Sequence, residues 1–432
     1  MALNQGLIAP LIKIQKIMLA LEYYYSIPRY LLTKALNTLF PRRFFPWLVP
    51  LRLRELPFTK PRPDWVVLRP RLCGICGSDL NLLKGEESYL LEPYASFPCI
   101  LGHEVVAEVV EAPADSGFAP GERVAVEPLL ACQSRGVAPC RYCAQGNYNL
   151  CEQFTEGELP PGVTLGFTHQ AMGGMAELMA APAHNLFRLP PDLTDEAAVL
   201  IDSLASALQP VLDNFPPDTA TVVIYGAGII GQQLLRSLRA LGSRARLVVV
   251  ARYPFQASLA EAGGADQVLL KPNRRELGEA LGCKFLPTTL GGGNLECGAD
   301  YFFDCVGSKD SLQAGLLALK ARGTLVLVGT AGTVGKVDIS SIWFRELRLT
   351  GSAMYATALF QGQPVRTYQM AVDLVARSDF PVAGLLTHIF HLSRYRQAFQ
   401  TALDKSHYKC VKVAVDLREK SNRGDLRKRK IS

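Results

Sequence analysis

Residues 221–231 read TVVIYGAGIIG, and this run decides the fold of the second half of the chain. Its first five residues are apolar or β-branched, which predicts a buried strand. Three glycines follow in a Gly-x-Gly-x-x-Gly pattern, and residues 232–241 continue with helical periodicity. Between a strand and a helix this pattern predicts a dinucleotide site, because the glycines let the backbone approach a pyrophosphate at the helix N-terminus. The predicted cofactor-binding residues of the run are Gly226, Gly228, Ile229, Ile230 and Gly231.

The residue after the second strand of this unit bears on which dinucleotide binds. Residues 247–250 form a run of Leu and Val, and Ala251-Arg252-Tyr253 follows where an acidic residue is expected for NAD. An acid there would accept from the ribose 2′-hydroxyl, whereas the guanidinium of Arg252 can hold a 2′-phosphate. Arg252 therefore favours NADP. The alternative is that Arg252 is simply exposed, in which case NAD is also used.

Upstream, a second stretch carries the residues for metal chemistry. It contains Cys73-Gly74-Ile75-Cys76-Gly77-Ser78-Asp79 and then, after a loop, Leu101-Gly102-His103-Glu104. Zinc accepts this mixture of sulfur, nitrogen and carboxylate oxygen, and glycines beside the donors let the backbone crowd the metal. The Ser78 hydroxyl could pass a proton. The alternative is that the cysteines are buried thiols and that His103 is a hydrogen-bonded core residue.

Together these motifs resemble the zinc-containing medium-chain alcohol and polyol dehydrogenases, the group of the sorbitol, threonine and butanediol dehydrogenases. The resemblance implies that Cys76 and His103 are catalytic zinc ligands and that Ser78 is the relay hydroxyl. The polyol branch has a glutamate where this chain has Asp202, which we therefore expect as the third ligand, with Glu104 in reserve. The backbone near Val306 and Gly329 is expected to line the nicotinamide.

The resemblance also implies a structural zinc held by four cysteines, with two, two and seven residues between them. Cys140, Cys143 and Cys151 match, but Val137 stands where the first cysteine belongs. Cys132 lies earlier, so we predict that residues 133–139 form a loop insertion that lets Cys132 reach the metal. Such a closed site does no chemistry and folds a lobe with little core of its own. The alternative is a lobe without zinc.

The implied fold class is α/β, with a GroES-like β catalytic domain split around a Rossmann domain that has a doubly wound parallel sheet. We expect residues 1–203 to form the catalytic domain, with the structural-zinc lobe at 132–151. Residues 204–350 would form the Rossmann domain, and 351–417 would return to the catalytic domain. Residues 283–298 are expected to be a glycine-rich loop with structural cysteines.

Composition limits the partners and the compartment. No apolar run reaches the ~18 uncharged residues of a membrane span. The odd count of 11 cysteines favours a reducing compartment, so we expect a cytoplasmic protein. The net charge is +7, but residues 418–432 contribute seven basic and two acidic side chains. That tail is expected to be disordered, and neither nucleic acid nor membrane is expected as a partner.

The sequence therefore predicts a zinc-dependent oxidoreductase that moves a hydride between a secondary alcohol or polyol, or the matching ketone, and a nicotinamide cofactor. Its partner would be a small-molecule substrate, and the resemblance implies a homo-oligomer, either a dimer or a tetramer. Asn81 stands where many relatives have histidine, which leaves the outer end of the proton path open. One alternative is a nucleotide-binding redox sensor or structural relative without dehydrogenase activity. Another is a zinc-free quinone or enone reductase, although Cys76 and His103 argue against it.

Overall fold

A six-stranded parallel sheet forms the centre of the nucleotide unit in the computed structural model, which describes residues 16–40, 43–290, 292–330 and 332–419. The strand order is β11-β10-β9-β14-β15-β16, so the order reverses between β9 and β14. The strands are β9 (Thr221–Tyr225), β10 (Arg246–Ala251), β11 (Gln267–Leu270), β14 (Ala299–Asp304), β15 (Leu319–Leu327) and β16 (Arg348–Gly351). All neighbouring pairs are parallel, and the doubly wound Rossmann sheet is confirmed.

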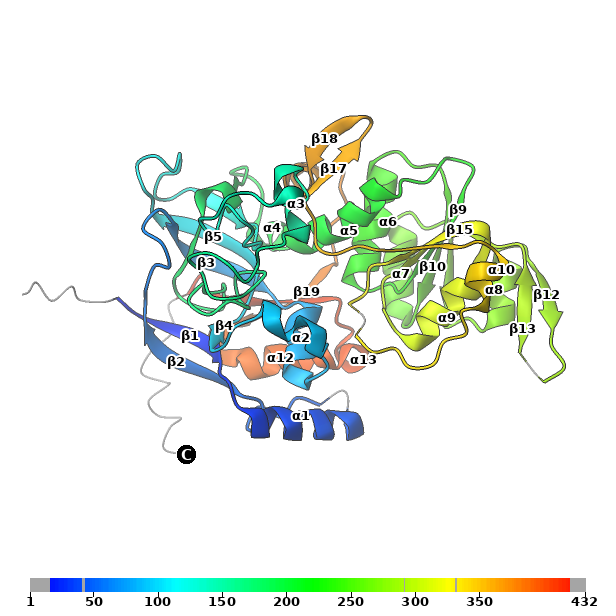
Figure 1. Ribbon diagram of the computed structural model, residues 1–432, viewed down its shortest axis with the longest axis horizontal. Helices are drawn as coiled ribbons and strands as arrows, with labels where there is room; N and C mark the ends of the chain where they lie inside the picture. Colours follow the sequence, from blue (N-terminus) through cyan, green and yellow to red (C-terminus); the bar gives the residue numbers. More distant parts are fainter. Residues whose placement is uncertain (1–15, 41–42, 291, 331, 420–432) are drawn as a thin grey trace, which may run out of the picture.

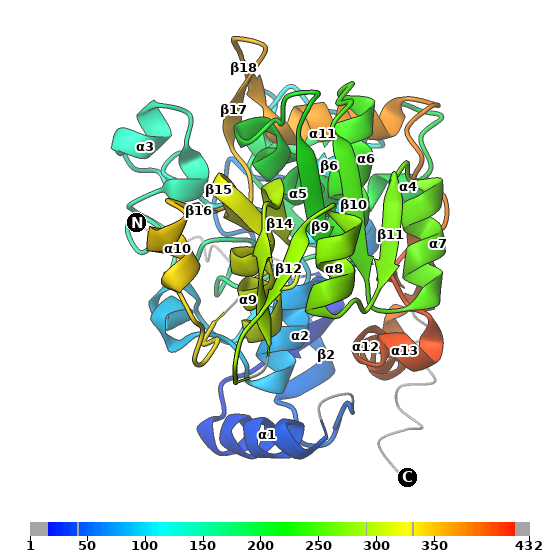
Figure 2. The ribbon, with the colours of Figure 1, turned by 90° about the vertical axis from the view of Figure 1, so that its right-hand side faces the viewer.

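Helices cover both faces of this sheet because alternate residues of its strands point to opposite sides. Val222 and Ile224 pack in one cluster with Leu234 and Leu238, whereas Val223 packs in another with residues of two other helices. The helices are α6 (Ile229–Ala240), α7 (Pro254–Ala262), α8 (Arg274–Ala280), α9 (Lys309–Ala318) and α10 (Ser340–Phe344). Figure 2 shows α8 and α9 on the side of the sheet nearest the viewer.

The catalytic unit is built on a second, seven-stranded sheet of order β19-β20-β3-β5-β6-β8, with β7 paired to β3. Its strands are β3 (Val66–Gly74), β5 (Glu104–Glu111), β6 (Arg123–Val126), β7 (Met179–Ala181), β8 (Leu186–Arg188), β19 (Leu386–His391) and β20 (Lys412–Asp416). β20, near the end of the chain, lies beside β3, near its start. The chain therefore leaves this sheet for the nucleotide unit and comes back to it, as Figure 1 shows from the colours.

A smaller three-stranded sheet of order β2-β1-β4 stands beside this unit, with a long helix below it. Its strands are β1 (Ile17–Tyr23), β2 (Leu51–Pro57) and β4 (Cys99–Ile100), and the helix is α1 (Ile27–Leu39). In both views α1, in dark blue, lies at the lower edge of the molecule. It contacts α2 (Gly77–Lys84), the helix that starts at the metal motif.

The remaining elements connect these units. The helices are α3 (Arg141–Ala144), α4 (Asp195–Ala198), α5 (Ile201–Asp213), α11 (Thr367–Ala376), α12 (Tyr395–Leu403) and α13 (Lys405–Tyr408). Four short 3-10 helices are η1 (Tyr89–Tyr94), η2 (Tyr148–Leu150), η3 (Ala183–Asn185) and η4 (Leu392–Arg394). Two hairpins are β12 (Lys284–Pro287) with β13 (Gly293–Glu296), and β17 (Thr357–Phe360) with β18 (Gln363–Arg366). The stretch expected to be a loop at 283–298 thus contains a hairpin, and the sulfurs of Cys283 and Cys297 lie 2.8 Å apart at its base.

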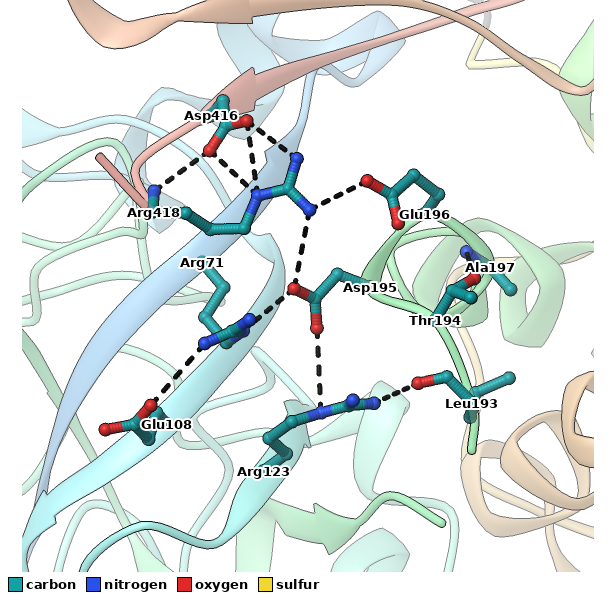
Figure 3. A network of polar contacts seen from close by, with 10 residues as sticks. All are labelled: Arg71, Glu108, Arg123, Leu193, Thr194, Asp195, Glu196, Ala197, Asp416 and Arg418. Carbon is teal, nitrogen blue, oxygen red and sulfur yellow. Dashed lines mark hydrogen bonds and ion pairs between the residues drawn. The ribbon is translucent and has the colours of Figure 1, made fainter. Parts of the chain in front are cut away.

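One buried carboxylate ties the end of the chain to the catalytic sheet. Asp195, at the start of α4, is contacted by Arg71 of β3 at 2.8 Å, Arg123 of β6 at 3.6 Å and Arg418 at 3.6 Å (Figure 3). Arg418 is the first residue of the expected tail, and residues 420–432 lie outside the described residues. Thr194 caps α4 by accepting from the backbone N–H of Ala197.

The domain boundaries remain predictions, and α5 runs across the one placed between residues 203 and 204. Within the described residues, no helix combines the length and the apolar character that a membrane crossing requires.

Candidate active site and metal centres

Three donor side chains converge where α2 and β5 begin. The ligand atoms of Cys76, His103 and Glu104 all lie within 4.8 Å of one another. Cys76 is the N-cap of α2, and its backbone N–H donates to Asp79 Oδ2 at 2.9 Å. Gly102 has φ +96°, and a Cβ there would collide with the thiol of Cys73, so only glycine lets the chain deliver His103. The two motifs predicted to share a metal therefore do come together.

Asp202, the expected third ligand, is buried in the first turn of α5 and is not one of these three donors. Its Oδ1 accepts a hydrogen bond from the Tyr355 hydroxyl, which is also buried. Glu104, the reserve ligand, is the carboxylate that lies with Cys76 and His103. Which carboxylate ligates remains a prediction, and the geometry places Glu104 first.

Two further side chains hold these donors. Lys412 of β20 forms an ion pair with Glu104, and both side chains are almost fully buried. Asp79 Oδ1 lies 3.9 Å from His103 Nδ1. A zinc-bound histidine commonly turns its second ring nitrogen toward a carboxylate in this way. Sequence reasoning missed Lys412, because no local pattern links β20 to β5.

The negatively charged side chains around His103 favour a bound cation at this site. Burial lowers the pKa of His103, but the Cys76 thiol and the Asp79 carboxylate outweigh it and raise that pKa to about 10. Burial raises the pKa of Asp202 to about 7, and the negative Glu104 adds to the effect. The thiol, imidazole and carboxylate set is the one that zinc prefers. His103 Nδ1 and Asp79 Oδ1 are also buried without a hydrogen-bond partner, so the residues present fit a bound cation.

The predicted proton relay lies on the same helix. Ser78 is the second residue of α2 and is partly exposed. Asn81, one turn further along, donates from Nδ2 to Thr330 Oγ1 at 3.5 Å, which connects the catalytic unit to the nucleotide unit. The role of Ser78 remains a prediction.

The second metal centre is a group of four cysteines. The sulfurs of Cys132, Cys140, Cys143 and Cys151 lie within 4.8 Å of one another, and Cys132 Sγ is 3.5 Å from Cys151 Sγ. The prediction that Cys132 returns to the other three across the 133–139 insertion is confirmed. Backbone N–H groups of Glu152 and Cys143 outweigh burial and lower the pKa of Cys140 to about 6, which favours the thiolate that a metal needs.

An arginine inside the insertion closes this lobe. Arg135 is fully buried, and its guanidinium donates to four backbone carbonyls. The acceptors are Glu156 at 2.6 Å, Leu159 at 2.8 Å, Pro160 at 2.7 Å and Gly162 at 3.0 Å. The insertion is thus an ordered part of the lobe, hydrogen-bonded to its other segment. Sequence reasoning missed the role of Arg135 because its partners lie more than 20 residues away.

The glycine motif lies at the point where the strand order reverses. Gly226 has φ +105°, and a Cβ on Gly231 would collide with the carbonyl oxygen of Gly226. A Cβ on Gly228 would meet nothing within 4 Å, so open space lies at the start of α6 where a pyrophosphate would bind. Val306 and Gly329 follow the neighbouring strands β14 and β15, and they touch each other. The residues predicted for the nicotinamide therefore share the carboxyl edge of the sheet.

Arg252 directly follows β10 and is exposed. Its guanidinium lies 5.7 Å from the centre of the Tyr253 ring, and its backbone N–H donates to Gln256 Oε1 at 3.3 Å. The side chain is free to approach a ribose phosphate at this edge.

Comparisons with known proteins cover most of the chain. One family model, described as the alcohol dehydrogenase GroES-like domain, matches residues 62–191, and another, described as zinc-binding dehydrogenase, matches 229–377. The chain is 28% identical over 354 residues to the sorbitol dehydrogenase of Homo sapiens. The aligned region covers 81% of this chain and 89% of that protein. It is 26% identical over 354 residues to the L-threonine 3-dehydrogenase of Coxiella burnetii, with 82% and 93% covered. Among solved structures, a zinc-binding dehydrogenase from Sinorhizobium meliloti bound to NADP has a TM-score of 0.69 at 25% identity and covers 93% of this chain and 100% of that one.

Proposed function

The chain belongs to the zinc-binding medium-chain dehydrogenases, and on this basis we propose that it transfers a hydride between a secondary alcohol or polyol, or the matching ketone, and NADP. The observation that carries the proposal is the convergence of Cys76, His103 and Glu104 in a unit joined to a Rossmann sheet. A metal site and a dinucleotide site in one chain are the two parts that alcohol oxidation by hydride transfer needs.

Each group of residues has a distinct task. Cys76, His103 and Glu104 would hold the catalytic zinc, with Asp202 as the alternative carboxylate. When bound, zinc supplies a Lewis acid that polarises the substrate oxygen. Lys412 fixes the Glu104 carboxylate, and Asp79 orients the His103 ring. The Ser78 hydroxyl passes the substrate proton toward solvent.

The nicotinamide cofactor supplies the hydride chemistry, and the chain binds and orients it. The glycines at 226, 228 and 231 hold the pyrophosphate, and the backbone at Val306 and Gly329 faces the nicotinamide. The relatives support this arrangement, because the Sinorhizobium meliloti enzyme was solved with NADP.

The test is a screen of secondary alcohols, polyols and ketones with NADPH, NADH and their oxidised forms, on protein whose zinc content has been measured. We expect turnover that is lost in Cys76→Ser. A protein that holds zinc and binds NADP(H) but turns over none of these substrates would contradict the proposal. It would favour the alternative of a nucleotide-binding redox sensor or structural relative.

Cofactor choice gives a separate prediction. Arg252→Ala should lower kcat/KM for NADPH by roughly tenfold relative to kcat/KM for NADH, because a charge-assisted contact to the 2′-phosphate is lost. Arg244→Ala, an exposed arginine elsewhere in the same unit, is the matched control and should leave the ratio unchanged. If Arg252→Ala leaves the ratio unchanged as well, the NADP preference is wrong. Compartment and oligomeric state remain predictions.

A further inference from the structure

Helix α1 turns its polar stripe toward the protein and its apolar stripe outward. Its inward positions are polar: Thr33 and Asn37 are buried, Asn37 donates to the carbonyl of Lys84 at 3.1 Å, and the Tyr30 hydroxyl donates to the carbonyl of Gly85 at 3.3 Å. Ordinary surface helices bury their apolar stripe and expose their polar one. α1 is attached to α2 by hydrogen bonds and leaves its apolar residues unused.

The outward side of α1 carries large apolar side chains. Large side chains on the helix and the loop after it are about half exposed or more: Ile27 53%, Leu31 53%, Leu32 51%, Leu39 70%, Phe40 49% and Trp47 67%. The neighbouring η1 extends this surface with Tyr89 and Leu90, and the Lys34 ammonium lies 4.6 Å from the centre of the Tyr89 ring. Large exposed apolar side chains gathered in this way mark an interaction site. We call it the α1 face.

The α1 segment itself is basic, whereas the exposed Glu86 and Glu92 flank the η1 end of the face. Residues 23–54 contain six Lys or Arg and no Asp or Glu. The guanidiniums of Arg29 and Arg43 each lie 6.0 Å from an aromatic ring centre, on Tyr24 and Phe45. Apolar residues with Trp, Tyr and cations around them are typical of protein surfaces at the headgroup level of a bilayer.

A hollow of about 420 Å³ adjoins the α1 face. Phe44 and Pro46, from the loop after α1, form one wall, and residues of β19, η4, α12 and α13 form the rest. Arg394 and Arg396 line it, both side chains are exposed, and no Asp or Glu is among its lining residues. A hollow with two guanidiniums, aromatic walls and no carboxylate suits an anionic group such as a phosphate.

The family models match residues 62–191 and 229–377. Of the residues that form the α1 face and the hollow, only those of η1 lie within these ranges. The α1 helix therefore lies outside the matched parts of the dehydrogenase framework, whereas the hollow is formed against β19 of the catalytic sheet. In Figures 1 and 2, α1 and α12 lie toward the lower part of the molecule, away from the nucleotide sheet.

We propose that the α1 face and the adjoining hollow dock on the surface of an anionic phospholipid bilayer. The apolar side chains of α1 enter the headgroup region, and Arg394 and Arg396 bind lipid phosphates. A second copy of the chain is a poorer occupant, because a two-fold contact would bring the Arg394 and Arg396 hollows of two copies together with no Asp or Glu among their lining residues to pair the guanidiniums. The protein would lie on the membrane without crossing it, which revises the expectation of no membrane partner.

The test is co-sedimentation of the full chain with vesicles. One set is phosphatidylcholine alone, and the other contains about one third phosphatidylglycerol. We expect binding to the anionic vesicles, weak binding to the neutral ones, and release as salt is raised. The double variant Leu31→Ser/Leu32→Ser should reduce binding by about tenfold or more, since two leucines leave the interface. Leu359→Ser, which changes a 70% exposed leucine on β17, is the matched control and should bind as the wild type does.

The hollow has its own pair of variants. Arg394→Glu/Arg396→Glu should abolish the preference for anionic vesicles, a fall of at least about tenfold, whereas the exposed control Arg244→Glu should retain the preference. Dehydrogenase activity and circular dichroism check that each variant is folded. The proposal is overturned if the wild type binds neither vesicle type, if the Leu31/Leu32 variant binds as the wild type does, or if Leu359→Ser loses binding equally. It is also overturned if sedimentation velocity shows a dimer that the Leu31/Leu32 variant breaks without any vesicle binding.

Discussion

At the scale of single residues, the candidate metal site depends on a buried ion pair. Lys412 and Glu104 are 3% and 2% exposed, so each charge has lost most of its water and depends on the other. A buried pair of this kind adds little net stability, but breaking it is costly because one charge is left uncompensated.

In zinc-free protein, Lys412→Met should therefore lower the free energy of unfolding by about 3 kcal/mol. The double variant Lys412→Met/Glu104→Gln should recover much of this loss, because the unpaired charge is gone. Chemical denaturation of both variants checks the prediction, with the exposed Lys309→Met as control. A loss in Lys412→Met no larger than in the control would show that the pair does not hold the fold.

His184 gives a prediction of pH dependence. Its Nε2 lies 3.0 Å from Ser134 Oγ in the cysteine lobe, and burial, helped by the Arg366 guanidinium, lowers its pKa from 6.5 to about 4. The folded state therefore favours the neutral ring. The stability gained from this is fully present above pH 6.5 and is lost as pH falls toward 4, because the unfolded chain takes up the proton first.

Between pH 7 and pH 4 the wild type should lose on the order of 3 kcal/mol more stability than His184→Gln, at about 1.4 kcal/mol per pKa unit. Denaturation curves of both proteins at several pH values measure the difference. Parallel losses in the two proteins would mean that His184 does not carry this part of the pH dependence.

At the scale of elements, the cysteine lobe is held by its loop as well as by its thiols. Arg135 donates to the carbonyls of four residues between 156 and 162, and its bonds to Leu159 and Gly162 are buried. Since a buried unpaired polar group costs roughly 1–3 kcal/mol, the arginine stabilises the conformation of this segment.

Arg135→Met should lower the free energy of unfolding by about 3–5 kcal/mol, because several carbonyls lose their donor together. It should also expose the 133–162 segment to limited proteolysis, with cleavage followed by mass spectrometry. Arg188→Met, an exposed arginine on β8, provides the comparison. Equal stability and equal proteolysis of the two variants would contradict an organising role for Arg135.

At the scale of the whole molecule, the two metal centres come from separate parts of the catalytic unit and should behave independently. One candidate centre has four cysteines within residues 132–151, and the other has donor side chains from α2 and β5. A closed four-thiol site stabilises its lobe, whereas a site with a mixed donor set does chemistry.

Purified wild type should contain about two zinc atoms per chain. Cys132→Ser should retain about one and have a lower Tm, because the lobe loses its metal. Glu104→Gln should also retain about one, whereas Asp202→Asn should keep about two, since Tyr355 already engages Asp202. Elemental analysis decides among these outcomes, and a zinc loss in Asp202→Asn but not in Glu104→Gln would make Asp202 the third ligand.

The sequence alone determined everything that depends on short spacing. The strand and glycines of residues 221–231 and the Gly-His-Glu and cysteine motifs all follow from neighbours within a few residues. Periodicity and backbone geometry act over that range, so these features, and with them the fold class, could be predicted.

Only the tertiary structure decided what depends on distant partners. The pairing of Lys412 with Glu104, the engagement of Asp202 by Tyr355 and the carbonyl contacts of Arg135 join residues that no local pattern connects. The orientation of α1 is the clearest case: its residue pattern gives an amphipathic helix, but which stripe faces the protein depended on the hydrogen-bond acceptors that α2 offers. Packing and desolvation act between residues that are close in space but distant in the sequence, so no local sequence pattern reveals them.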